Sequence, residues 1–143
     1  CSDPRRVDSD DRGAWIVKGA LVVCSRAVDP LALFASIAEH SERLEAASCD
    51  GSVQLTDDRG RKLTVFGDPV PMVEWERERQ AIADRSCCVN GEDLRAYEVE
   101  CRWEDLFCCV VHLAAAKLDY LVVVDGNSEV HPGTAVRPES IQL

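Results

Sequence analysis

Cys108 and His112 are the residues of this chain whose types and spacing most readily suggest chemistry. They stand four residues apart in a predicted helix, so their side chains can approach each other on one face, with Asp105 one turn earlier. A thiolate beside an imidazole could serve as nucleophile and base, or as two ligands of a metal ion. Catalysis also needs an orienting group, and a structural zinc ion needs four ligands, but the chain has only 3 histidines. We therefore predict a partly exposed helix face with Cys109 packed beneath it, and the thiol site is the alternative.

Asp125 follows an apolar run and precedes a Gly-Asn pair. The stretch 121–127 resembles the first strand of NYN/PIN-type nucleases, and that resemblance implies that Asp125 would hold a metal ion. Those families build their sheet after this strand, whereas 143 minus 125, or 18, residues follow Asp125 here. A turn formed by Asp-Gly-Asn explains the same residues without chemistry. We predict the turn, and the metal site is the alternative.

Two glutamate-rich segments are candidates for a binding surface. In the stretch 74–79, glutamate and arginine alternate around a tryptophan, which is typical of a solvated helix face. Tryptophan and arginine also dominate the energetics of protein interfaces. In the stretch 94–101, strict alternation predicts a half-buried strand with its glutamates on the exposed face. The candidate partner-binding residues are Glu74, Trp75, Glu76, Glu78, Glu98 and Glu100.

The composition narrows the function classes. A chain of 143 residues fits one domain. Its 26 acidic and 16 basic residues give a formal charge of −10, which repels phosphate backbones and argues against nucleic-acid binding. No apolar run is long enough to span a membrane. Glycine-rich nucleotide loops, nucleophile elbows, zinc-protease motifs and calcium loops are all missing, so we expect no cofactor and no metal.

Eight cysteines are many for this length, but their spacing lacks the CxxC pairs of zinc sites. Several, such as Cys24 and Cys101, fall where an apolar residue is expected, and free cysteine packs well as a small hydrophobe. We predict mostly reduced core cysteines in a cytoplasmic protein, with a disulfide framework as the alternative. Cys1 and the charged stretch after it are also typical of a bacterial lipoprotein, so a lipid anchor at the cell envelope is a second alternative to the cytoplasm.

The order of elements predicts an α+β fold. Residues 1–13 are expected to be a flexible charged segment, and residues 14–143 a single domain. We predict a two-layer sandwich, with an antiparallel or mixed sheet of about five or six strands and two main helices on one face. Trp15 and Trp103, which begin a strand and a helix, are expected in core or cap packing. The predicted elements are a strand over 14–27, a helix from Pro30 to about Ala47 that ends at Gly51, strands over 52–56 and 62–67, a helix over 72–86, a strand over 94–101, a helix over 104–118, a strand and return strand within 120–131, and an edge segment over 135–143.

Two stretches, 14–66 and 94–131, share the predicted order strand, helix, strand, strand.

The charge, the size and the predicted fold together favour a small, acidic, non-catalytic module that binds a basic protein. Bacterial immunity proteins and antitoxins have this profile, because an acidic surface can plug the basic cleft of a nuclease toxin. The alternatives are a small enzyme that uses Cys108 with His112, or Asp125 with a metal, and a lipid-anchored accessory protein tethered through Cys1.

Overall fold

A computed structural model describes residues 19–85 and 89–143. Within them, seven strands form one sheet in the order β2-β3-β4-β5-β1-β6-β7, and every adjacent pair is antiparallel. The predicted α+β class is confirmed, with seven strands in place of five or six. The elements are β1 (Gly19–Ser25), α2 (Pro30–Glu39), β2 (Glu45–Cys49), β3 (Ser52–Thr56), β4 (Lys62–Phe66), the short 3-10 helix η2 (Met72–Trp75), α3 (Glu76–Arg85), the 3-10 turn η3 (Gly91–Asp93), β5 (Leu94–Cys101), α4 (Glu104–Ala115), β6 (Val122–Val124) and β7 (Val130–Pro132).

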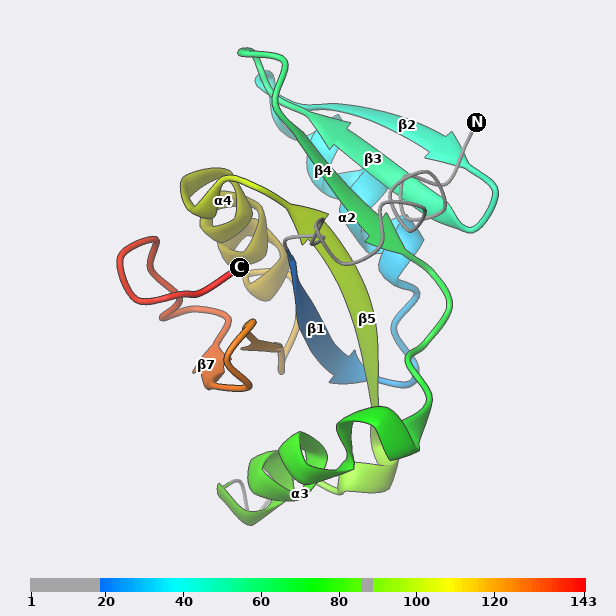
Figure 1. Cartoon of the computed structure of the whole chain (residues 1–143). Helices are drawn as coiled ribbons and strands as arrows, with labels where there is room; N and C mark the ends of the chain where they lie inside the picture. The colour runs from blue at the N-terminus through cyan, green and yellow to red at the C-terminus, as the bar shows by residue number, and fades with distance from the viewer. Residues whose placement is uncertain (1–18, 86–88) are drawn as a thin grey trace, which may run out of the picture.

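Helices pack on both faces of the sheet. In Figure 1, α2 lies behind β3 and β4, and α3 lies beyond the lower ends of β1 and β5. Helices α2 and α4 bury Phe34 and Phe107 in the main core, against one face of the strands, as predicted for two helices. The opposite face carries a smaller apolar cluster in which Trp75 and Ile82, from η2 and α3, pack on Val23. Alternate residues of β1 point to opposite faces, so the single strand serves both clusters. The third helix, α3, therefore covers part of the face opposite to α2 and α4.

Helix α2 ends earlier than predicted. Asp29 caps its start as expected, because its carboxylate accepts hydrogen bonds from the backbone N–H groups of the first turn. The helix stops at Glu39, residues 40–44 form a turn, and the end of the predicted helix belongs to the edge strand β2. The Asp50-Gly51 pair is the two-residue loop of the β2–β3 hairpin, where Gly51 has a φ of +74°. Gly51 therefore turns a hairpin, and the prediction that it terminates the helix was wrong.

The other predicted elements correspond closely to observed ones. The β3–β4 hairpin, β5, α4 and the β6–β7 pair all form, and α3 occupies most of the predicted helix over 72–86. Because β2 adds a strand, the first predicted repeat reads strand, helix and three strands, so the symmetry with the second is incomplete. The C-terminal stretch adds no strand among the described residues. It packs Val136 and Ile141 into the main core instead.

Some predictions fall outside the described residues: the flexible segment 1–13 with Cys1, and the start of the first strand with Trp15. Two of the eight cysteines, Cys87 and Cys88, also lie outside them. None of the helices in the described residues combines the length and the hydropathy that a membrane span requires.

Candidate functional site

The residues of the suspected thiol site on α4, Cys108, His112 and Asp105, have different surroundings and different partners. Cys108 faces the main core and is 3% exposed, whereas Cys109 is exposed, so the predicted arrangement was inverted. Burial raises the pKa of Cys108 to about 11, which leaves it a protonated thiol at neutral pH. The Nε2 atom of His112 lies 2.7 Å from the carbonyl oxygen of Val136 and ties α4 to the C-terminal stretch. Asp105 is bonded to Arg61 instead, at 3.0 Å.

Most described cysteines behave as small core hydrophobes. Cys24, Cys101 and Cys108 are buried and free, and burial raises the pKa of each to about 11. Cys109 is also free but exposed. Cys49 is disulfide-bonded. The prediction of reduced core cysteines therefore holds for three positions and fails for Cys49.

Alkylation of the native protein should separate the neighbouring cysteines of α4. We expect iodoacetamide at neutral pH to label the exposed Cys109 quickly. Cys24, Cys101 and Cys108 should react only after unfolding, because they are buried and burial raises the pKa of each thiol, whereas the thiolate is the reactive form. Peptide mass spectrometry locates the label, and Cys109→Ser is the control that removes the fast site. Labelling of Cys108 at the rate of Cys109 in folded protein would contradict the burial described above.

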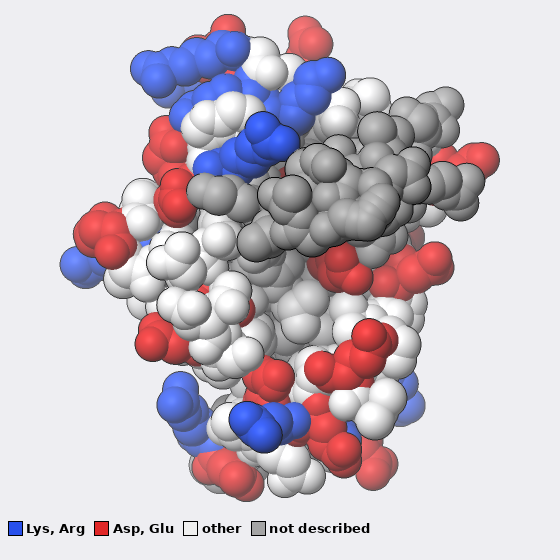
Figure 2. Space-filling view, in the orientation of Figure 1, with Lys and Arg blue, Asp and Glu red and all other residues white. Residues whose placement is uncertain are grey.

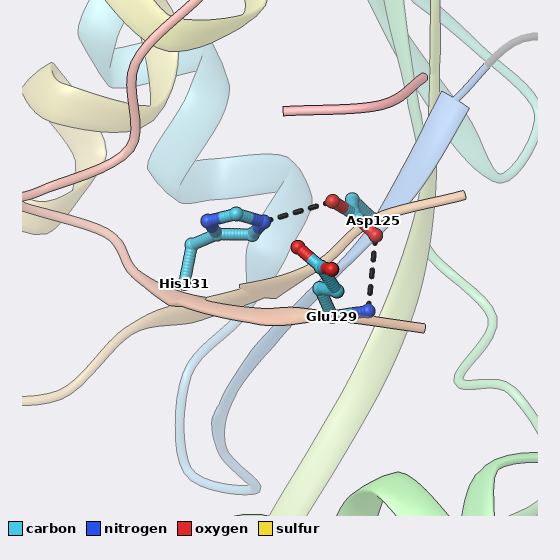
Figure 3. Close-up of side chains that lie close together, drawn as sticks. All are labelled: Asp125, Glu129 and His131. Atoms are coloured by element: carbon cyan, nitrogen blue, oxygen red, sulfur yellow. Dashed lines mark hydrogen bonds and ion pairs between the residues drawn. The ribbon is translucent and has the colours of Figure 1, made fainter. Parts of the chain in front are cut away.

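Asp125 organises the turn between β6 and β7. One carboxylate oxygen accepts hydrogen bonds from the backbone N–H groups of Asn127 and Glu129, at 2.9 and 3.0 Å. The other accepts from the backbone N–H of Gln142, at 3.3 Å, and lies 2.8 Å from Nε2 of His131 (Figure 3). The Asp125 side chain is 1% exposed. A single buried carboxylate thus holds the hairpin, its return strand and the C-terminal stretch together.

A metal ion does not fit this carboxylate well. Asp125, Glu129 and His131 do bring potential ligand atoms within 4.8 Å of one another. Each Asp125 oxygen, however, already has two partners, which fills the usual acceptor capacity of a carboxylate. The predicted turn accounts for the Asp-Gly-Asn residues, and the aspartate works as a structural group.

The pKa of Asp125 reflects these contacts. Burial alone raises the pKa of the carboxyl group, because the charged form loses water. The hydrogen bonds from His131 and from the backbone N–H groups of Glu129, Asn127 and Gln142 outweigh burial and hold the pKa below its ordinary value. Asp125 is therefore a charged group at neutral pH, although it is buried.

The candidate partner-binding residues converge on one hollow of about 390 Å³. Its walls carry Glu74 and Glu78 from η2 and α3, and Glu98 and Glu100 from β5, although the two segments are 20 or more residues apart in the sequence. Glu76 does not line it; its exposed carboxylate lies 3.5 Å from the largely buried Arg79. Further residues that line the hollow are Gly19, Ala20, Leu21, Val70, Trp75, Val99, Val124, Asp125 and Ser128.

The sheet register explains this convergence. Glu98 and Glu100 pair with Leu21 and Gly19 of β1, and this register turns both carboxylates away from α2 and α4. Helix α3 and η2 cover the same face, so their glutamates meet those of β5 across the hollow. Figure 2 shows this face: acidic side chains gather near α3, with some arginines among them, and a group of lysine and arginine side chains lies at the opposite end, over the β3–β4 tip.

Among the described residues that line the hollow, Trp75 and Glu78 each have a buried polar atom that lacks a hydrogen-bond partner. These atoms are the indole Nε1 of Trp75, a residue only 1% exposed, and Oε2 of Glu78. One is a donor and the other an acceptor, and they do not satisfy each other. Buried polar groups are nearly always paired in folded proteins. The sequence identified both residues, but only the fold reveals that their polar atoms lack partners.

A second hollow, of about 300 Å³, lies at the basic end of the molecule, and its charges balance. Arg61 bridges Asp57 and Asp105, at 2.8 and 3.0 Å. The remaining charged lining residues are Arg43, Asp58 and Arg59. With three cations and three anions, this hollow offers no strong preference for a ligand of either sign.

Comparisons of the chain with protein-family models, with curated proteins and with solved structures found no match. The assignment of a function therefore depends on the geometry and electrostatics of the molecule itself.

Proposed function

We propose that the protein is a small non-catalytic binding module that docks a basic protein partner at the acidic hollow. One observation supports this most: Glu74, Glu78, Glu98 and Glu100, from two distant segments, line the same concave surface. The formal charge of −10 adds a long-range field of the same sign. Complementary charge speeds the encounter of two proteins and suppresses wrong partners.

The candidate catalytic residues give less support to an enzyme. Cys108 is a buried thiol, and His112 uses its Nε2 atom to hold Val136. Asp125 has all its acceptor positions occupied. An inhibitor that blocks a basic cleft, as immunity proteins and antitoxins do, needs only shape, charge and a stable fold.

Affinity capture with charge-reversed variants tests this proposal. The wild type and Glu78→Lys are immobilised and exposed to lysate of the source organism at low and moderate salt. We expect a basic, salt-sensitive protein on the wild type and about tenfold less of it on Glu78→Lys, because repulsion replaces attraction in the hollow.

Glu76→Lys is the matched control. Glu76 and Glu78 both lie in the first turn of α3, so both variants change the net charge and the helix dipole interaction alike. Only Glu78 lines the hollow. Equal capture by the wild type and Glu78→Lys, or equal loss with both variants, would contradict docking at this site.

A further inference from the structure

We infer that the hollow recognises one arginine or lysine side chain together with the peptide carbonyl next to it, in an extended basic segment of the partner. This inference rests on the proposed function and specifies its chemistry. It follows from the two buried atoms that lack partners, the indole Nε1 of Trp75 and Oε2 of Glu78.

The two atoms require opposite ligand groups. The indole N–H of Trp75 can only donate, so its partner must be an acceptor such as a peptide carbonyl. The carboxylate of Glu78 can only accept, so its partner must be a donor, and a cationic donor forms the stronger hydrogen bond. A basic residue in a peptide offers both groups, a few bonds apart. A bare cation offers only one.

The lining of the hollow also suits such a side chain. Leu21, Val70 and Val124 provide an apolar floor, and the first two pack against the Trp75 cluster. Arginine and lysine lay their methylene stems on apolar surface while the charged end reaches polar groups. The exposed Glu74 stands on the same wall as Glu78 and adds negative charge where that end would lie.

The size of the hollow favours one residue over a larger element. A volume of about 390 Å³ is at the lower end of the roughly 300–1,000 Å³ typical of ligand pockets. A helix about 10 Å wide would need a broader groove. An extended segment can insert a single side chain and leave the rest of its chain on the rim.

The test observes the Trp75 indole directly. A blocked hexa-arginine peptide is titrated into nitrogen-15-labelled protein at low salt, and the Trp75 indole N–H resonance is identified by its loss in Trp75→Phe. Hexa-citrulline is the neutral control peptide, and spermine is a cation without a carbonyl. We expect a saturable shift of this resonance with hexa-arginine, at least tenfold weaker affinity for hexa-citrulline, and no comparable shift with spermine.

Variants separate the two halves of the recognition. Glu78→Gln should weaken hexa-arginine binding about tenfold, whereas Glu76→Gln should leave it unchanged, because only Glu78 lines the hollow. The wild-type indole resonance gives a readout even if Trp75→Phe is less stable.

Two outcomes would overturn the inference: no saturable shift of the Trp75 indole with hexa-arginine, or an equal shift with spermine. These outcomes are distinct from failure of the proposed function. If Glu78→Lys still loses the captured partner while the indole does not respond, the docking site stands and only this mode of recognition fails.

Discussion

Replacement of Asp125 by alanine is expected to lower the free energy of unfolding by about 3–5 kcal/mol, because it leaves buried donors without an acceptor. The donors are three backbone N–H groups and His131, and they belong to the β6–β7 turn, the return strand and the C-terminal stretch. Urea titration followed by circular dichroism measures the change. Asp119→Ala is the control, since Asp119 is exposed in the loop before β6.

The same residue gives the stability a defined pH dependence. The pKa of Asp125 is lower in the folded protein than its ordinary value near 3.9. Its contribution is therefore complete above the unfolded pKa and is lost as the pH falls through the folded pKa. We expect the difference in unfolding free energy between wild type and Asp125→Ala to be constant near neutral pH and to shrink below about pH 4. A difference under 1 kcal/mol at pH 7, or one that grows in acid, would contradict this account of the turn.

Replacement of Trp75 by alanine should lower the free energy of unfolding by a similar amount, about 3–5 kcal/mol, because it leaves a cavity at the centre of the smaller core. Trp75 is 1% exposed and packs with Ile82 and Val23, so its removal detaches α3 from the sheet. Trp103 provides the comparison within the same protein. It is 37% exposed, with Arg61 at 5.9 Å from its ring centre, and Trp103→Ala should cost less than about 1 kcal/mol.

Thermal and urea unfolding of the two alanine variants, in the same buffer, checks this ranking. Equal losses, or a larger loss for Trp103→Ala, would contradict the packing of η2 and α3 against the sheet. The result also matters for binding, because Glu74 and Glu78 reach the hollow only while Trp75 holds their segment in place.

Periodicity predicted most elements but misjudged one boundary. Leu44 and Ala47 fit a helical stripe that continues from Phe34, so the sequence favoured a long helix. The Asp50-Gly51 pair was also consistent with a two-residue hairpin loop, and pairing with β3 decided the outcome. A local sequence pattern does not reveal whether one more helical turn is more stable than strand pairs that form only when the sheet assembles.

The sequence predicted the residues of the candidate site, but it did not predict how they are arranged in space. Alternation correctly placed Glu98 and Glu100 on one face of β5. Their meeting with Glu74 and Glu78 depends on α3 covering that face, and the order of strands in a sheet is not encoded in any local pattern. The helical stripe likewise failed to decide which of Cys108 and Cys109 is buried, because adjacent residues lie only about 100° apart around a helix.

The association rate of the captured partner tests the central claim, docking at the acidic hollow, most directly. Stopped-flow fluorescence would compare the wild type with a Glu74→Lys/Glu78→Lys double variant at low and high salt. We expect the double variant to associate about 10- to 100-fold more slowly at low salt, with the gap narrowing as salt screens the charges. Equal rates for the two proteins at low salt, with the variant still folded, would show that the partner does not dock at this hollow.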